Sequence, residues 1–146
     1  FTFLATARGT PLIYYGDEIA MPGGNDPDNR RDFPGGWPAD PRNAFEPAGR
    51  SDVEQSVFSH LQTVLKLRAE RAALRHGVAN NLHVGDQEWV YSRGGTLVAI
   101  NNGRAEATVS VPVQVVGTDV LRNCGTPVRN GTTMSITIPA RSSCIF

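Results

Sequence analysis

The sequence has no excess of either charge, no long apolar run and few cysteines. Lysine and arginine together number 14, aspartate and glutamate together also number 14, and the net charge is zero. Without a basic patch or a polybasic segment, the composition does not indicate binding to nucleic acid or to a membrane surface. No apolar stretch approaches the ~20 residues of a membrane-spanning helix. We therefore expect neither nucleic acid nor a membrane as a partner.

The residues that bind metals are also scarce. Cys124 and Cys144 are too few for a disulfide framework. The sequence favours two separate buried thiols, and a bridge between late strands is the alternative. Residues 26–29 offer carboxylate and amide oxygens, but a calcium-binding loop would need glycine where Arg31 stands and glutamate where Trp37 stands. We predict no metal and no cofactor.

Residues 9–19, Gly-Thr-Pro-Leu-Ile-Tyr-Tyr-Gly-Asp-Glu-Ile, are the most informative stretch. A short apolar run, residues 11–15, lies between turn residues, which is typical of a strand buried on both faces of a parallel sheet. Two acids, Asp17 and Glu18, follow where such sheets place their ligands. Neighbouring residues on a strand point to opposite faces, so these two acids are a poor acid and nucleophile pair.

The segment GTPLIYYGDEI, followed by GGNDPDNRRDFPGGW at residues 23–37, resembles the eighth barrel strand and the next loop of the α-amylase family of glycoside hydrolases, glycoside hydrolase family 13. The loop is most similar to that of the neopullulanase and cyclomaltodextrinase branch. The resemblance extends over essentially the whole chain. A complete (β/α)8 barrel takes ~250 residues, so we expect only the C-terminal end of a longer protein. The resemblance implies that the catalytic carboxylates precede this segment, so we predict no catalytic residue here.

By this resemblance, Asp26 and Arg30 match an aspartate and an arginine that contact sugar at the non-reducing-side subsites. A carboxylate accepts hydrogen bonds from adjacent hydroxyls, while a guanidinium donates to hydroxyls and pairs with the carboxylate. The alternative is a salt bridge that stabilises the loop and binds no ligand. Asp28, Arg31 and Asp32 are close enough to exchange roles with this pair, and Arg31 is also a candidate for support of the pocket.

Aromatic residues near the loop are further candidates. Trp37 and Phe33 offer flat faces for sugar rings, and we expect Phe33 to act instead as an anchor for the loop. Tyr14 and Tyr15 are expected in the barrel core, with one hydroxyl reaching the pocket, and Tyr15 is a candidate for pocket support. Glu18 is another candidate for pocket support. The alternative is that Glu18 is buried and pairs with an arginine of the missing barrel.

Two helical segments are predicted. Residues 1–8 indicate the end of a helix whose apolar face holds Phe1, Phe3, Leu4 and Ala7. The segment Ser51-Asp-Val-Glu54 has the form of a capping box and predicts a longer helix near residues 52–76. Its apolar residues recur at helical spacing from Val53 to Leu65, which indicates core packing.

Short strands separated by Gly, Asn and Pro begin at Val78, and they predict an antiparallel sandwich. The predicted strands are residues 89–91, 96–102, 107–111, 134–138 and 143–146. The fold class is therefore mainly β, a C-terminal antiparallel β-sandwich preceded by the last β-strand, loop and helix of a truncated (β/α)8 barrel. Residues 1–76 would be the end of the barrel, and residues 77–146 the sandwich domain.

The resemblance implies the C-terminal part of a retaining hydrolase of α-1,4-glucans or cyclodextrins. Such a part would contribute sugar-subsite residues and a structural β-sandwich, with an oligosaccharide and the missing N-terminal barrel as its partners. The alternative is a stand-alone carbohydrate-binding sandwich that holds glucan on exposed aromatics. Trp89 and Tyr91 are the candidates for that role, and their alternation with Val90 suggests that they are only half available. A secreted, a periplasmic and a cytoplasmic location are all left open.

Overall fold

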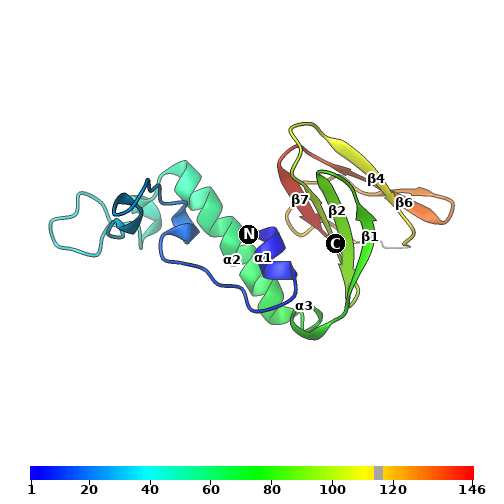
Figure 1. Cartoon of the computed structure of the whole chain (residues 1–146), viewed down its shortest axis with the longest axis horizontal. Helices are drawn as coiled ribbons and strands as arrows, with labels where there is room; N and C mark the ends of the chain where they lie inside the picture. The colour runs from blue at the N-terminus through cyan, green and yellow to red at the C-terminus, as the bar shows by residue number, and fades with distance from the viewer. Residues whose placement is uncertain (114–116) are drawn as a thin grey trace. The chain divides into compact units, whose positions relative to one another are not determined.

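The computed structural model describes residues 1–113 and 117–146, which form two antiparallel sheets and a small number of helices (Figure 1). The prediction of a mainly β fold with a C-terminal antiparallel sandwich is confirmed. The helices are α1 (Thr2–Thr6), α2 (Asp52–Glu70) and α3 (Ala73–His76), with short 3₁₀ turns η1 (Asp17–Ile19), η2 (Asp28–Arg30) and η3 (Pro47–Gly49). The strands are β1 (Ala79–Val84), β2 (Glu88–Arg93), β3 (Thr96–Asn101), β4 (Ala107–Val111), β5 (Val128–Asn130), β6 (Thr133–Ile138) and β7 (Ser142–Ile145).

The chain divides into two compact units. Unit 1 consists of residues 1–10 and 64–146, and unit 2 consists of residues 11–63. The helix α2 contributes residues to both units. The predicted boundary between 1–76 and 77–146 refers to the domains of a longer protein and stays a prediction.

The sandwich in unit 1 has its core between a four-stranded sheet, in the order β1-β2-β3-β7, and a three-stranded sheet, in the order β4-β6-β5. Alternation along the strands builds this core. In β4, Val109 and Val111 are buried, while Thr108 and Ser110 on the other face exchange side-chain hydrogen bonds with β6. Both sheets thus turn one apolar face inward, as the period of two in the sequence predicts.

The outer face of the four-stranded sheet is covered by α1. Thr6 hydrogen-bonds to the buried Tyr91 hydroxyl, and Thr2 hydrogen-bonds to Ser143 at 2.7 Å. The buried side of α1 is therefore Thr2, Ala5 and Thr6, and the predicted apolar face was wrong. Phe3, for example, is 53% exposed. Burial of the threonines is favourable because each hydroxyl finds a partner on the sheet.

Two buried arginines of unit 1 bind the carbonyl groups at the ends of α1 and α3. Arg68 donates to the carbonyls of Ala5 and Leu74, at 2.8 and 2.9 Å. Arg93, which is 3% exposed, donates to the carbonyls of Thr6 and Gly77, at 3.0 and 3.1 Å. The last carbonyls of a helix lack intrahelical partners and carry partial negative charge, so guanidinium groups stabilise them.

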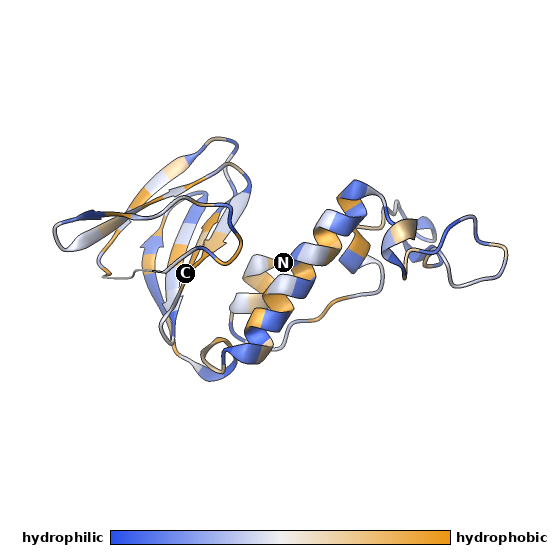
Figure 2. Cartoon of the chain, turned by 180° about the vertical axis from the view of Figure 1, so that it is seen from behind, coloured by the Kyte–Doolittle hydropathy of each residue, from blue (hydrophilic) through white to orange (hydrophobic). Residues whose placement is uncertain are grey.

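The start of α2 is formed as predicted. The Ser51 amide donates to Glu54 Oε2 at 2.8 Å, and the Glu54 amide donates to Ser51 Oγ at 3.3 Å, which is a capping box. Figure 2 shows apolar and polar residues on different sides of α2. Of the apolar residues predicted to pack in the core, Leu61 and Val64 are buried, but Val53 is 69% exposed. The predicted core packing thus holds only for the later turns of the helix.

The predicted strand at residues 11–15 is not formed. A parallel barrel strand needs a hydrogen-bonded neighbour on each edge, and unit 2 contains no other strand. The expectation that its tyrosines lie in a core is corrected as well, since Tyr14 is 56% exposed and Tyr15 is 41% exposed.

Cys124 and Cys144 form a disulfide, so the favoured prediction of two free thiols was wrong. Their Cα atoms are 5.9 Å apart, which is a usual separation for a bridge. The neighbouring Asp119 is buried and accepts hydrogen bonds from four backbone amides, those of Leu121, Asn123, Cys124 and Ile145. Its oxygens and the bridged sulfurs are thus already engaged, so this cluster does not offer a metal site.

Among the described helices, none is both long and apolar enough to cross a bilayer.

Candidate functional site

The candidate residues lie in unit 2, on a loop that local hydrogen bonds hold in shape. At its start, Asp17 accepts from the Tyr14 amide at 2.9 Å, and Glu18 accepts from the Gly16 amide at 2.8 Å. Gly16 has φ = 90°, a left-handed conformation that glycine adopts without strain. Both carboxylates therefore stabilise the turn after residue 15, and Glu18 supports the loop locally.

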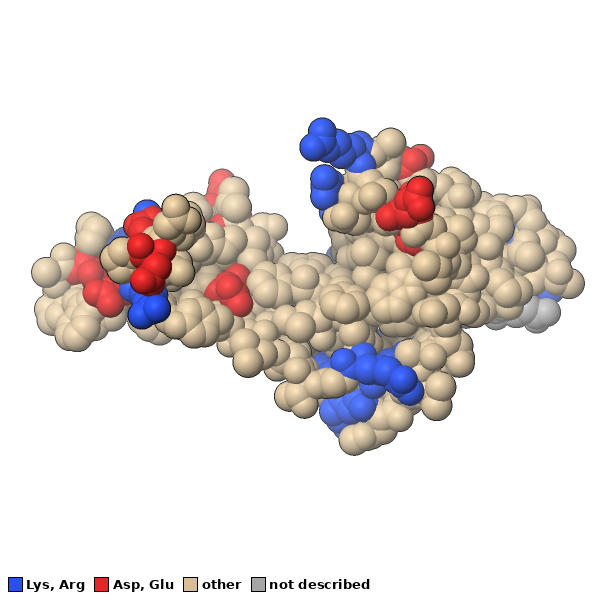
Figure 3. Space-filling model, viewed as in Figure 1, with Lys and Arg blue, Asp and Glu red and all other residues tan. Residues whose placement is uncertain are grey.

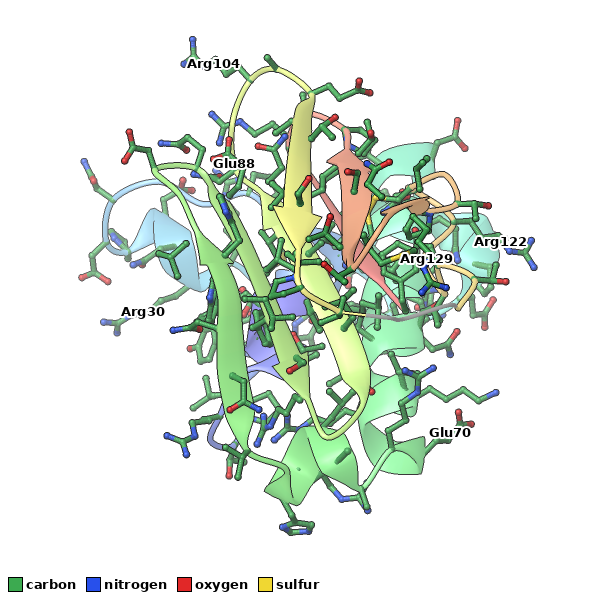
Figure 4. All side chains as sticks on the ribbon, turned by 90° about the vertical axis from the view of Figure 1, so that its right-hand side faces the viewer. Arg30, Glu70, Glu88, Arg104, Arg122 and Arg129 are labelled. Atoms are coloured by element: carbon green, nitrogen blue, oxygen red, sulfur yellow. A yellow bond between two sulfur atoms is a disulfide. The ribbon has the colours of Figure 1, made fainter. Side chains whose placement is uncertain are left out.

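Asp26 and Arg30 form an ion pair across one turn, with 3.1 Å between Asp26 Oδ1 and Arg30 Nε. The side chains are 64% and 71% exposed. Figure 4 shows Arg30 extending away from its ribbon. An exposed ion pair contributes little to stability. Both groups therefore remain accessible, and their remaining donor and acceptor positions face solvent.

Asp28 and Arg31 form a second, separate pair. Arg31 donates from Nε and Nη2 to the two oxygens of Asp28, both at 2.7 Å, in the planar geometry typical of arginine and carboxylate. These bonds from Arg31, together with the Gly24 amide, lower the pKa of Asp28. The same pairing raises the pKa of Arg31. The structure thus pairs Asp26 with Arg30 and Asp28 with Arg31, and the second pair also fastens the loop to Gly24.

Tyr15 packs against Tyr14, with 4.6 Å between the ring centroids. Desolvation raises the pKa of its hydroxyl, the neighbouring Tyr14 and the carboxylate of Asp32 raise it further, and Arg30 lowers it.

Trp37 is 63% exposed and lies on a turn fixed by Asp40. The Asp40 carboxylate accepts hydrogen bonds from the amides of Gly35 and Trp37, at 2.7 and 3.0 Å. Phe33 packs against Phe45 with 4.5 Å between ring centroids, in the manner of a loop anchor. Asp40 was not predicted from the sequence, although an aspartate that follows the Gly-Gly-Trp-Pro segment is a recognisable turn signal. No described contact joins Trp37 to the Asp26–Arg30 pair.

The end of the loop is fastened to α2 by two arginines that the sequence did not indicate. Arg42 donates to both oxygens of Glu54 at 2.7 and 2.8 Å. With the Ser51 amide, this bond lowers the pKa of Glu54 to about 2. The guanidinium of Arg50 lies 3.6 Å from the centre of the Phe58 ring, a cation–π contact. The loop is therefore shaped by polar and charged contacts.

Charge on the loop is mixed. Figure 3 shows acidic and basic side chains close together on the visible face of this part of unit 2. A surface of this kind suits a neutral ligand with many hydroxyl groups better than a highly charged one.

The comparisons with known proteins agree with the resemblance in the sequence. No family model matches the chain. A cyclomaltodextrinase of Geobacillus thermopakistaniensis is 30% identical over 123 residues, which are 80% of this chain and 19% of that protein. Neopullulanase 2 of Thermoactinomyces vulgaris is 32% identical over 128 residues, 84% of this chain and 20% of that protein. The chain spans about a fifth of the length of these curated relatives.

A solved structure supports the same assignment. The debranching enzyme of Nostoc punctiforme superposes with a TM-score of 0.75 at 32% identity, covering 99% of this chain and 29% of that one. Sequence and fold together thus define a C-terminal part of a glycoside hydrolase. More narrowly, the chain corresponds to the C-terminal part of the α-amylase family, glycoside hydrolase family 13, and its relatives include the predicted neopullulanases and cyclomaltodextrinases.

Proposed function

We propose that this chain is the substrate-contacting C-terminal part of a retaining hydrolase that acts on α-1,4-glucans or cyclodextrins. The names of its relatives support the substrate class, since they are a cyclomaltodextrinase and a neopullulanase. The observation that carries the role of this chain is the accessible ion pair of Asp26 and Arg30 on a loop with a fixed shape.

The pair suits recognition of sugar hydroxyls. Asp26 accepts hydrogen bonds from two adjacent hydroxyls, while the outer nitrogens of Arg30 donate to a third oxygen. Trp37 presents an exposed indole, whose face suits the apolar C–H side of a sugar ring. Tyr15, Glu18 and Arg31 support the loop around these contacts.

The catalytic carboxylates belong, in this proposal, to the missing N-terminal barrel of the same protein. The acids of the first turn are engaged with backbone amides, and Asp28 is engaged with Arg31, so they are unsuited to act as acid and nucleophile. The sandwich of unit 1 then has a structural role, and the chain alone is inactive.

The test is hydrolysis of starch, pullulan and cyclodextrin by this chain and by a longer version that includes the preceding barrel. We expect activity only in the longer protein. There, Arg30→Ala should lower kcat/KM by about 10 to 100-fold, because it removes one charge-assisted hydrogen bond of about 1.5 to 3 kcal/mol. Hydrolysis by the short chain would show that its own carboxylates perform the chemistry, and would refute the assignment.

The second candidate function is a stand-alone carbohydrate-binding sandwich. It needs an aromatic surface on unit 1. Tyr91 is completely buried and Trp89 is half-buried, so the predicted half availability holds for Trp89 alone. If this module were the whole function, the longer protein would bind glucan without hydrolysing it.

A further inference from the structure

Two asparagines of the sequence, Asn102 and Asn130, are followed by glycine, and the structure gives them different surroundings. Asn102 follows β3 and Asn130 is the last residue of β5, and both are exposed in unit 1. An asparagine before glycine is chemically reactive, because glycine has no Cβ to hinder the approach of its amide nitrogen to the asparagine side chain. The two sites can therefore be compared within one molecule.

Asn130 lies at the tip of the hairpin that joins β5 to β6. It pairs with Thr133, so Gly131 and Thr132 form a two-residue turn. Gly131 has φ = 61°, which suits the first central position of a primed hairpin turn. Figure 1 shows this hairpin, in orange, projecting from the rest of the sandwich. Since all residues of β5 are exposed, the tip can open locally without disturbing the core.

The reactive groups at this tip are lightly held. Within the part of the chain that the structure describes, the Gly131 amide donates no hydrogen bond. The Asn130 side chain makes one, from Nδ2 to Ser135 Oγ at 2.9 Å. Only this one bond of the reacting atoms has to break before the Gly131 nitrogen and the Asn130 side chain can meet.

Asn102 and the glycine that follows it are held at three points. Asn102 Nδ2 donates to Gln87 Oε1 at 3.2 Å, and Asn102 Oδ1 accepts from Arg141 Nη1 at 2.9 Å. The Gly103 amide donates to Asn101 Oδ1 at 2.7 Å. Asn101 is itself 1% exposed, so this acceptor is fixed in the fold. Exposure alone therefore does not distinguish the two asparagines, whereas their hydrogen bonds do.

We propose that Asn130 is a site of spontaneous deamidation in the folded protein, and that the fold protects Asn102 from the same reaction. The Gly131 nitrogen attacks Asn130 Cγ and forms an N–Cγ bond. The Cγ–Nδ2 bond breaks, and the amide leaves as ammonia with the proton of the Gly131 N–H. Water then opens the resulting succinimide ring. Opening at the side-chain carbonyl gives aspartate, and opening at the main-chain carbonyl gives isoaspartate.

Both products change the hairpin. Each replaces the neutral amide by a carboxylate, so the donor to Ser135 Oγ is lost. Isoaspartate also places an extra carbon in the main chain, which breaks the pairing of Asn130 with Thr133. The strand β6 keeps its pairing with β4, and its residues Met134 and Ile136 stay in the core. The modification therefore loosens β5 and leaves the sandwich folded.

Peptide mapping of the folded chain measures both sites in one experiment. After incubation in mildly alkaline buffer, trypsin, which cleaves after lysine and arginine, separates them into the peptides 94–104 and 130–141. Mass spectrometry follows the loss of ammonia and the gain of water, and fragment ions distinguish Asn102 from Asn101. An isoaspartyl methyltransferase assay detects isoaspartate. We expect Asn130 to deamidate at least about tenfold faster than Asn102, because fewer hydrogen bonds must break.

Two variants test the contact that holds the Asn130 side chain. Ser135→Ala removes the acceptor of Asn130 Nδ2 and should speed deamidation of Asn130 about two- to fivefold. Thr137→Ala is the matched control. It lies two positions further along β6 and removes a similar hydroxyl contact, with Thr108, so it should leave the rate unchanged. Incubation in urea is the control for the local sequence, and there Asn130 and Asn102 should react at similar rates.

Three results would contradict the proposal. Equal rates at Asn130 and Asn102 in the folded protein, or an unreactive Asn130, would overturn it. A difference that persists in urea would overturn the protection of Asn102 by the fold, because the local sequence would then explain it. Equal acceleration by Ser135→Ala and Thr137→Ala would mean that general loosening of β6 controls the rate. These measurements use no sugar, so they are independent of the proposed function.

Discussion

Two arginines of unit 1 and two arginines of unit 2 use charge in opposite ways. In unit 1, Arg68 and Arg93 are buried and donate to backbone carbonyls at helix ends. In unit 2, Arg30 and Arg31 are exposed and pair with aspartates that are also exposed. A buried guanidinium that loses its partners costs far more than an exposed ion pair contributes. Arg68 and Arg93 of unit 1 therefore stabilise the fold, while Arg30 of unit 2 is free to serve a ligand.

The two units also differ in how far their apolar residues are buried. Unit 1 has the core of the sandwich, formed by both sheets. In unit 2, the buried apolar residues are Ile19, Ala44 and Leu61, and Leu12 remains 75% exposed. A segment with so little apolar burial depends on polar contacts and turns for its shape. Unit 1 therefore has an apolar core of its own, whereas unit 2 exposes apolar surface that suits the proposed barrel.

The largest effect on stability is expected from Arg93→Met. It keeps the bulk of the side chain but leaves the carbonyls of Thr6, Arg75 and Gly77 without their donor. We expect a loss of about 3 to 5 kcal/mol in the free energy of unfolding, measured by urea denaturation. The control, Arg104→Met, changes an exposed arginine and should shift stability by less than about 0.5 kcal/mol. Equal losses in both variants would show that burial of Arg93 has no special role.

The second largest effect on stability is expected from removal of the disulfide between Cys124 and Cys144. It closes a segment with a sequence separation of 20 residues and ties the Asp119 loop to β7. Replacing both cysteines by serine should lower the free energy of unfolding by about 2 to 3 kcal/mol. Reduction of the wild-type protein with dithiothreitol should lower the urea midpoint similarly. If oxidised and reduced protein unfold at the same urea concentration, the bridge does not stabilise unit 1.

Local sequence signals predicted much of the fold. The capping box needs only Ser51 and Glu54, and the strands β4 and β6 show regular alternation, so both were predicted correctly. The strand β1 was missed because Asn80 and Asn81 interrupt any apolar pattern. The strand β5 has only three residues, and all of them are exposed.

The burial of residues that the sequence did not predict depends on partners far away in the sequence. Thr6 is buried because of Tyr91, which is 85 positions away, and Thr2 because of Ser143, 141 positions away. No local pattern carries such information. For the candidate site, Asp26, Arg30 and Trp37 came from the resemblance, and their roles as sugar contacts stay predictions. Asp40 was missed because it acts on backbone amides and touches no expected ligand.

The contact between Arg42 and Glu54 predicts that the stability of the fold depends on pH. The pKa of Glu54 in the folded protein is about 2, below its ordinary value of 4.5. The stabilisation is therefore fully present above about pH 4.5 and is lost as the pH falls toward 2. Arg42 is 40% exposed, so solvent screening reduces the contribution to about 1 kcal/mol.

The measurement compares wild type with Glu54→Gln from pH 7 to pH 2 by urea denaturation. The difference between the two proteins should disappear at the acidic end. Glu46→Gln, at an exposed glutamate of the same unit, is the control and should show little difference at any pH. A difference for Glu54→Gln that persists at pH 2 would mean that the effect does not come from the carboxylate charge.

The smallest effect on stability is expected from Arg30→Ala, and this variant tests the comparison most directly. The Asp26–Arg30 pair is exposed, so its loss should change the free energy of unfolding by less than about 0.5 kcal/mol. Binding should respond differently, since the proposed function gives Arg30 a hydrogen bond to sugar. In the longer protein that includes the barrel, Arg30→Ala should weaken maltoheptaose binding about tenfold. Lys66→Ala removes a similar exposed pair, with Glu70, and should change neither quantity. A loss of stability without a loss of affinity would assign Arg30 to the loop structure, and the two units would then use charge alike.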